Sequence, residues 1–416
     1  MSSEPKEKLS LDEIARGFES LRTKGEDGEI AFGGFKFDDL ETVFFTSIKW
    51  DESLSEYERE RIAFKAPFKA GEAGKITAKT LLSALGELEK EILSAKPTDF
   101  IVVFSISLRY RPFLTSIKVD DAQIEFFQTL PKEIDRTPIR HPLHLGDLVE
   151  IPDNYSVVTV KVSSKTIYAA YVRALTALEV LRGIWNGNIN SKTDMTLRIG
   201  GTRDFKPINK IRLGPVHTVH LPDGSLATKE WWYQSRFEAG DVEDLTNEWE
   251  IFQNNSSFFL DRYHALPYKQ QATDMWIRYV NAFDHTDRDA TFLQLWSLLE
   301  LLTGTNGERY DETIRRTLFI CEEREFHRLI LEHLRDRRNA QVHQADGSSK
   351  VEQHVYQLKR YVEELLRLHH ACCGRFKNMA EIGEFLSLPD NPAVLRERRR
   401  LYGQALVFRQ RTLAQK

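Results

Sequence analysis

Cysteines are scarce in this chain, and long apolar runs are missing. Its 416 residues include three cysteines, Cys321, Cys372 and Cys373, with no C-x-x-C pair, so we predict no disulfide framework and a reducing compartment. No apolar stretch approaches the roughly 20 residues of a membrane-spanning helix. The polar N-terminus MSSEPKEKLS lacks the apolar region of a secretory signal. We therefore expect a soluble, cytoplasmic protein with no membrane partner.

Several well-known catalytic motifs are also missing. The sequence has no Walker loop, no G-x-G-x-x-G and no G-x-S-x-G, and it shows no internal repeat or low-complexity linker. A net charge of −4 does not indicate nucleic-acid binding by the molecule as a whole. With 41% hydrophobic and 29% charged residues, the chain is typical of globular proteins. Its length favours two domains, and we expect no cofactor.

The first half mixes strand and helix patterns. Alternating or β-branched runs predict strands at 29–37, 42–50, 99–110 and 113–119. Helical spacing predicts a helix over 76–95, and a second long helix that begins after an N-cap at Ser163-Ser164 and stops at Asn186-Gly187. Strands joined by a Pro-Asp-Gly turn follow. We predict an α+β domain over residues 1–238.

From Asp241 onward the strand pattern disappears. Helices are predicted at 242–263, 270–283, 289–302, 312–320, 323–338 and 349–373. The segment 289–302 is apolar nearly all round, which indicates a buried central helix. The fold class we expect is α+β: a mixed α+β domain followed by an all-α helical bundle over residues 239–416.

The stretch LRDRRNAQVHQADGS, residues 334–348, stands at the end of a predicted bundle helix. Arginine–histidine pairs at similar spacing occur at 136/141, 212/217, 278/285 and 328/333, so spacing alone does not single out a site. Arg338 and His343 differ because Asn339 follows the arginine and an Ala-Asp-Gly-Ser turn follows the histidine. We expect a helix break there, which would free His343 from helical geometry and place both side chains in a cleft.

This context resembles a known family. The segments FLQLWSLLELLTG, RRTLFI, LEHLRDRRNAQVHQADG and VYQLKRYVEELLR, within about residues 268–375, resemble a HEPN domain of the Apea-like kind. The family signature is an arginine, four to six residues and a histidine, here Arg338-Asn339-Ala340-Gln341-Val342-His343. The α+β half resembles uncharacterised domains that precede such modules, which suggests a sensor or regulatory role.

The resemblance implies a metal-independent endoribonuclease with an active site formed between two chains, in toxin–antitoxin, phage-defence or other stress systems. Catalytic roles then fall to Arg338, His343 and Asn339. RNA is the expected substrate, a homodimer through the helical half the expected assembly, and an antitoxin or trigger protein a further partner. Cleavage by the 2′-hydroxyl of RNA needs a base, an acid and positive charge near the phosphorus, which histidine and arginine can supply. One motif histidine per chain cannot readily be base and acid at once, which favours a dimer.

Simpler explanations stand beside these roles. Arg338 and His343 could cap a helix end by bonding to its carbonyls. Asn339 could contact phosphate, orient His343, or cap the chain break. Arg335 and Arg337 could hold substrate phosphates or be solvated, with Asp336 neutralising part of the charge. A non-catalytic RNA-binding or scaffold protein that dimerises through the bundle is the alternative function.

Three further features allow more than one interpretation. Glu300 lies on the apolar central helix, where we expect a basic partner, with a supporting role in the site as the other possibility. The cluster His369, His370, Cys372, Cys373 matches no standard zinc spacing, so we predict core packing and no metal site. The final segment, residues 393–416, holds seven Lys/Arg against one acidic residue. It is either a solvated face or a track for phosphates.

Overall fold

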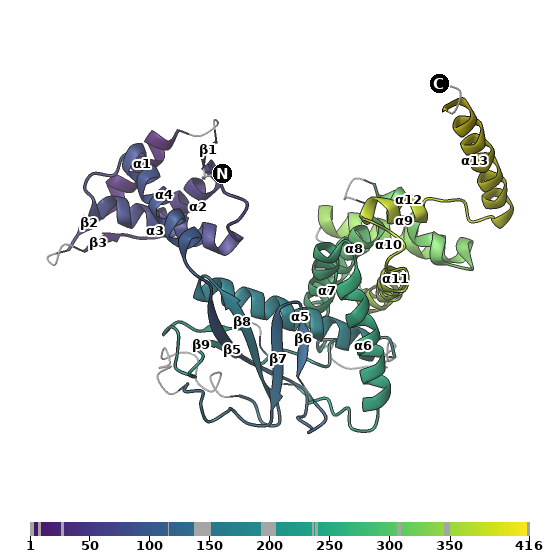
Figure 1. Ribbon diagram of the computed structural model, residues 1–416, viewed down its shortest axis with the longest axis horizontal. Helices are drawn as coiled ribbons and strands as arrows, with labels where there is room; N and C mark the ends of the chain where they lie inside the picture. Colours follow the sequence, from purple (N-terminus) through teal and green to yellow (C-terminus); the bar gives the residue numbers. More distant parts are fainter. Residues whose placement is uncertain are drawn as a thin grey trace.

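The structure is a computed structural model. It describes residues 4–6, 10–25, 29–114, 116–136, 151–192, 205–234, 237, 240–305, 309–344 and 350–413, without the side chains of 341–344 and 411–413. Figure 1 shows an N-terminal helical unit, a β-sheet crossed by one long helix, and a helical bundle, arranged in chain order. The predicted mixed α+β class is confirmed. None of the described helices combines the length and apolar content needed to cross a membrane.

The N-terminal unit has a core of its own. Its helices are α1 (Leu11–Leu21), α2 (Phe35–Ser47), α3 (Glu56–Glu72) and α4 (Ala78–Ser94), with the short strand pairs β1 (Glu4–Pro5) with β4 (Ile48–Lys49) and β2 (Arg22–Lys24) with β3 (Ile30–Phe32). Phe18 and Phe44 are fully buried and meet edge to face, with ring centroids 6.1 Å apart. Aromatic packing of this kind holds the helices together.

Only short parts of the two predicted strands 29–37 and 42–50 are strands, Ile30–Phe32 and Ile48–Lys49. Residues 42–47 belong to helix α2, and of the run 29–37 only Ile30–Phe32 is a strand. The aromatic and β-branched residues of α2 favour a strand locally. Their helical spacing instead turns Phe37 and Phe44 toward Phe18, and this packing outweighs the local preference. The predicted helix 76–95 is confirmed as α4, capped by Thr77.

The sheet is antiparallel and has six strands in the order β10-β9-β5-β8-β7-β6. The strands are β5 (Thr98–Ile106), β6 (Ile117–Val119), β7 (Ala122–Phe127), β8 (Ser156–Ser164), β9 (Val216–His220) and β10 (Trp232–Tyr233). The long central pair β5–β8 carries a row of buried valines, with Val102 opposite Val160. The predicted Pro-Asp-Gly turn is present after β9, with Gly224 at φ +87°.

Helix α5 (Ile167–Asn190) covers the sheet, and both of its predicted ends are wrong. Strand β8 continues through Ser164, and the N-cap is Thr166, whose side chain accepts from the amide of Ala169. At the other end the helix runs on through Asn186-Gly187. The Asn186 amide bonds the backbone of Ile211 in both directions, at 2.8 and 3.0 Å. The absence of a side chain at Gly187 lets the Trp276 ring pack against the helix. A Cβ at position 187 would lie 3.1 Å from that ring.

The bundle consists of α6 (Trp249–Ala265), α7 (Lys269–Asp284), α8 (Arg288–Thr303), α9 (Tyr310–Thr317) with a 3₁₀ turn at Leu318–Ile320, α10 (Arg324–Gln344), α11 (Val351–Ala371) and α12 (Met379–Leu386). Helix α8 is buried as predicted, capped by Asp287 and ended by left-handed Gly304. Helix α6 starts later than predicted because the Glu243 backbone pairs with Ser107 and Arg109, both at 2.9 Å. A last helix, α13 (Pro392–Leu413), stands apart from the bundle (Figure 1).

Sheet and bundle share one buried core. Its apolar members run from Phe100 to Leu386, whereas the N-terminal core runs from Ile14 to Leu85. Polar groups are buried between sheet and bundle as well. The fully buried Arg182 of α5 donates to Glu179, to Asp284 of α7, and to the carbonyl of Ile211, at 2.6 to 3.2 Å. The expected domain division at residue 238 stays a prediction, since the segments on either side contribute to the same core.

Replacing Arg182 with Met should destabilise the protein by about 3–5 kcal/mol, because two carboxylates then lose their buried cation. Urea unfolding midpoints measure this loss. Arg173→Met, on the exposed side of the same helix, removes a surface ion pair with Asp121 and should cost about 1 kcal/mol or less. Equal midpoints for the Arg182 variant and the wild type would contradict the structural role given to Arg182.

Candidate functional site on helix α10

Helix α10 carries Arg335, Arg337, Arg338, Asn339 and His343. Buried Leu331 and Leu334 anchor it to the bundle. The predicted helix break before His343 is wrong: the helix continues to Gln344, because no glycine or proline interrupts the segment before Gly347. Residues five apart on a continuous helix lie about 140° apart around its axis. The backbone positions 338 and 343 therefore lie on different sides of α10.

Arg338 lies against an aromatic ring. Its guanidinium carbon is 4.7 Å from the ring centroid of Tyr310, the first residue of α9, and its Nη1 is 3.5 Å from the Asn339 side-chain oxygen. Among the described side chains, no carboxylate forms an ion pair with Arg338. The half-buried cation is thus held in place by a cation–π contact while its charge stays available to an anion.

The two neighbouring arginines are already ion-paired. Arg335 contacts Asp311 at 2.8 Å and Asp336 at 3.0 Å. The side chain of Arg337 is 9% exposed and faces Asp289 of α8 at 3.4 Å. From the sequence, Arg337 could either hold phosphates or be solvated. In the structure most of its side chain is buried. A phosphate would have to compete with these carboxylates, so the RNA-binding role of Arg335 and Arg337 stays a prediction.

The other predicted site residues are Asn339, His343 and Glu300, and the structure describes the contacts of two of them. The Asn339 side chain contacts its neighbour Arg338. The side chain of His343 lies outside the described residues, so its expected place in a cleft with Arg338 stays a prediction. Glu300 accepts from the indole nitrogen of Trp296 at 2.8 Å. Within the described part of the chain no basic group pairs with Glu300, so its expected basic partner is replaced by an indole.

Sequence reasoning overlooked a histidine pair beside this helix. The Nε2 atoms of His333 on α10 and His354 on α11 are 3.3 Å apart, and the charge of Arg337 acts on His354. His354 is 5% exposed; burial, with the charges of His333 and Arg337, lowers its pKa to about 4. The imidazole is therefore neutral near pH 7. His354 follows Val351 by three residues on the apolar face of α11, which is the signal that could have located it.

The histidines at the end of α11 are core residues. His369 bonds the Leu302 carbonyl at 2.9 Å, and the Trp276 indole donates to His370 at 3.2 Å. Both imidazoles are buried. Throughout the described ranges, no three His, Cys, Asp or Glu side chains are placed to hold a metal ion. The predicted packing role of His369 and His370 is confirmed.

His354 should make stability pH-dependent. Its folded-state pKa lies below the ordinary value near 6.5, so the unfolded state binds more protons between about pH 6.5 and 4. Stability should be fully present above this window and fall as the pH drops through it. Urea midpoints at about pH 7.5 and 5 should therefore differ less for His354→Phe than for wild type. An unchanged difference would mean that His354 is protonated in the folded protein.

Comparisons with protein-family models, curated proteins and solved structures find no match to this chain. The family likeness of the helical half thus rests on its own residues and their order along the chain.

Proposed function

We propose that this protein is a metal-independent endoribonuclease of HEPN type that works as a cytoplasmic homodimer in a stress, toxin–antitoxin or phage-defence response. The observation that carries the proposal is the Arg338 guanidinium, held over Tyr310 with no described carboxylate partner. Its position, five residues before His343 on a bundle helix, matches the family signature. The α+β half would sense the trigger or restrain the nuclease, alone or with an antitoxin.

The chemistry requires few groups. The ribose 2′-hydroxyl loses a proton and attacks the adjacent phosphorus, while the leaving 5′-oxygen gains a proton. A histidine with an ordinary pKa near 6.5 can act as base or acid around neutral pH. Arginine supplies fixed positive charge that pairs with two phosphate oxygens at once as negative charge builds there. We assign the proton transfers to His343 and the charge stabilisation to Arg338, with Asn339 orienting one of them.

Helix continuity supports a site composed of two chains. Because positions 338 and 343 lie about 140° apart around the axis of α10, we infer that one phosphate is better served by Arg338 of one copy and His343 of another. A twofold axis would create two such sites, each with access to both chains. The outer face of α10 also exposes Phe326 (56%) and Leu329 (69%), apolar side chains suited to contact between the two helical halves.

A second function is favoured by one observation. Arg335 and Arg337 are already neutralised by Asp311, Asp336 and Asp289, which leaves less free positive charge for substrate than the sequence suggests. A bundle of this kind could bind RNA weakly, or only dimerise, without cleaving. Turnover, rather than binding, separates this scaffold role from the nuclease.

Arg338→Ala and His343→Ala chains should each retain less than about a tenth of wild-type RNA cleavage, because losing charge stabilisation (Arg338) or acid–base catalysis (His343) costs roughly 10²–10⁴ in rate. Mixed in equal amounts and allowed to exchange, they should recover some cleavage, at most about a quarter of the wild-type level, since half the dimers are mixed and each keeps one pair of Arg338 and His343 but lacks the second His343. Arg328→Ala and His333→Ala, earlier on α10, are the matched controls and should stay active. Inactive single variants with no recovery on mixing would place the site within one chain.

The cleavage products should identify the nucleophile. With 2′-hydroxyl attack, cutting of total RNA continues in excess EDTA and leaves a 2′,3′-cyclic phosphate or 3′-phosphate and a 5′-hydroxyl. A single 2′-deoxy residue at the cut position should protect that bond alone. Products with a 5′-phosphate, formed only with added metal, would instead mean that water attacks. Binding of RNA without any cleavage would favour the scaffold role.

A further inference from the structure

A cavity of about 210 Å³ opens between helices α5 and α6 and the edge strand β6. One water molecule needs far less space, and packed helices in proteins leave few voids of this size. Drug-sized ligands occupy pockets of roughly 300–1,000 Å³, so this cavity suits a molecule of one or two rings. It lies away from helix α10 and takes no part in the proposed RNA cleavage. We call it the α5–α6 cavity.

The sequence of α6 explains why this space exists. The residues of α6 that line the cavity follow one another at alternating steps of three and one, which places them on the face that packs on α5. They are Trp249, Phe252, Gln253, Ser256, Ser257 and Leu260. Two adjacent serines thus stand where large apolar side chains would otherwise fill the interface between the helices. Their small side chains leave the cavity open.

Two indole rings form much of the apolar wall. Trp185 of α5 and Trp249 of α6 both lie beside Phe252, with ring centroids 5.7 and 5.8 Å from that of the phenylalanine. Each indole also stacks on a second phenylalanine: Trp249 on Phe113 at 4.5 Å, and Trp185 on Phe126 of β7 at 5.4 Å. These contacts fix the orientation of both indoles. Aromatic rings held in this way are suited to stacking on a flat ring of a ligand.

The polar side chains of the α5–α6 cavity are uncharged. They are Ser116, Gln253, Ser256 and Ser257, and none of the described residues that line the cavity carries a charge. Ser256 is 8% exposed and accepts from the Asn188 amide at 3.3 Å, but its own hydroxyl hydrogen has no acceptor within the described part of the chain. An acceptor on a ligand would satisfy this buried donor. An ionised ligand would find no opposite charge there.

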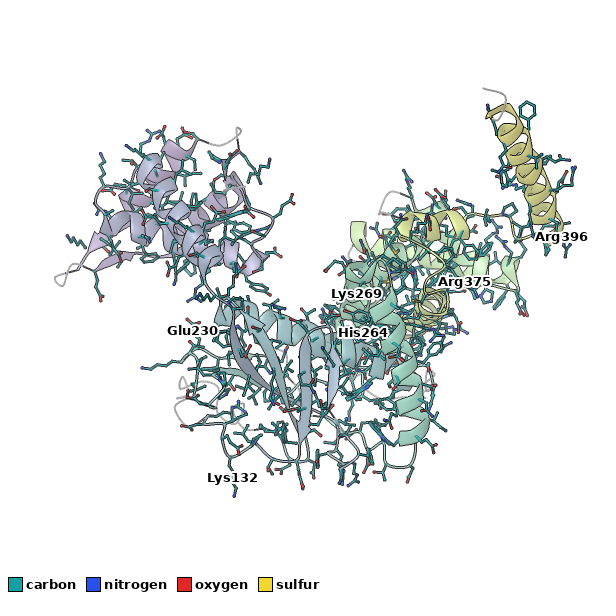
Figure 2. The ribbon with its side chains drawn as sticks, viewed as in Figure 1. Lys132, Glu230, His264, Lys269, Arg375 and Arg396 are labelled. Carbon is teal, nitrogen blue, oxygen red and sulfur yellow. The ribbon has the colours of Figure 1, made fainter. Side chains whose placement is uncertain are left out.

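The edge strand is fastened to the bundle next to the cavity by Asp120, which follows β6. Its carboxylate accepts from the Tyr263 hydroxyl at 3.1 Å and from the Lys269 ammonium at 2.8 Å, and its backbone N–H donates to His264 at 3.2 Å. Figure 2 shows His264 and Lys269 close together. Because Ile117 of β6 lines the cavity, these bonds hold one wall of it in place. A wall fixed before binding lowers the entropic cost of binding a ligand.

We propose that the α5–α6 cavity binds a free, uncharged nitrogen heterocycle of nucleobase size. The flat ring would stack on the indoles of Trp185 and Trp249, and a ring nitrogen or carbonyl oxygen would accept from the Ser256 hydroxyl. A ring without an acceptor would leave that hydroxyl unsatisfied. A base within an RNA strand would bring phosphates to a site whose described lining holds no cation. The ligand would touch both α5 and α6, so its binding would strengthen the contact between sheet and bundle.

The test uses fluorine NMR on full-length protein labelled with 5-fluorotryptophan. Adenine, hypoxanthine, cytosine and uracil are titrated separately, and Trp249→Phe and Trp50→Phe chains assign the resonances. At least one base should shift the Trp249 resonance to saturation, while that of Trp50 in the N-terminal unit stays in place. No saturable shift with any base would overturn the proposal. So would equal binding of indole, which lacks an acceptor, or a shift caused by hexaadenylate RNA and by none of the free bases.

Substitutions on α6 locate the site. Ser257→Leu fills the cavity and should weaken binding at least about tenfold, with the urea unfolding midpoint unchanged or raised. Asn255→Leu, an exposed position of α6 that does not line the cavity, is the matched control and should bind as the wild type does. Ser256→Ala removes only the hydroxyl and should weaken binding about two- to tenfold. Wild-type affinity in the Ser257→Leu chain would overturn the site, and wild-type affinity in the Ser256→Ala chain would overturn recognition through that hydroxyl.

Discussion

The buried guanidinium of Arg182 is the interaction on which the sheet and the bundle both depend. It is fully enclosed, and its donors reach a carboxylate on its own helix, a carboxylate at the end of α7 and a backbone carbonyl before β9. Burial raises the pKa of Glu179 to about 7, while the charge of Arg182 opposes the rise. A charged group is tolerated at such depth only when its hydrogen bonds are made, so these three segments are held in one arrangement.

The same polar layer extends toward the bundle. Asn209 donates to Asp284 and to the Val280 carbonyl, and the Tyr279 hydroxyl donates to Glu363 of α11, which also pairs with Lys359. Desolvation raises the pKa of Glu363, and Lys359 opposes it. A chain of directional bonds thus fixes how α5, α7 and α11 are oriented. Apolar packing alone would leave that orientation less specific.

The sequence predicted those elements whose pattern and boundaries are both local. Helices α7, α8 and α11 carry apolar stripes, and α8 begins and ends with an Asp cap and a glycine, so their bounds agree with expectation within a few residues. Helix α2 was missed because its aromatic residues favour a strand until they pack on Phe18. The end of α5 was misplaced because Asn186 bonds a distant segment near Ile211. Hydrogen bonds between segments far apart in the chain cannot be predicted from the local sequence pattern.

The sequence predicted which residues of α10 make up the candidate site better than it predicted their contacts. The arginines of α10 were found by their order, but the turn residues after His343 suggested a break that occurs later. The partners that decide the charge of the site, Tyr310, Asp311 and Asp289, come from three other positions along the chain. His354 was hidden within an apolar stripe. Each of these depends on which helix faces α10, which local spacing does not determine.

The separation of the two cores has a consequence for how the chain folds during synthesis. The core of the N-terminal unit lies within residues 14–85, so that unit can fold soon after it leaves the ribosome. The packing of α5 against the bundle cannot be completed so early, because Arg182 waits for its second carboxylate, Asp284, which follows 102 residues later. Until then the apolar face of α5 that packs on α7 stays uncovered. The early-folding unit is therefore tethered for a time to a sheet and helix whose packing is incomplete, and exposed apolar surface of this kind favours aggregation.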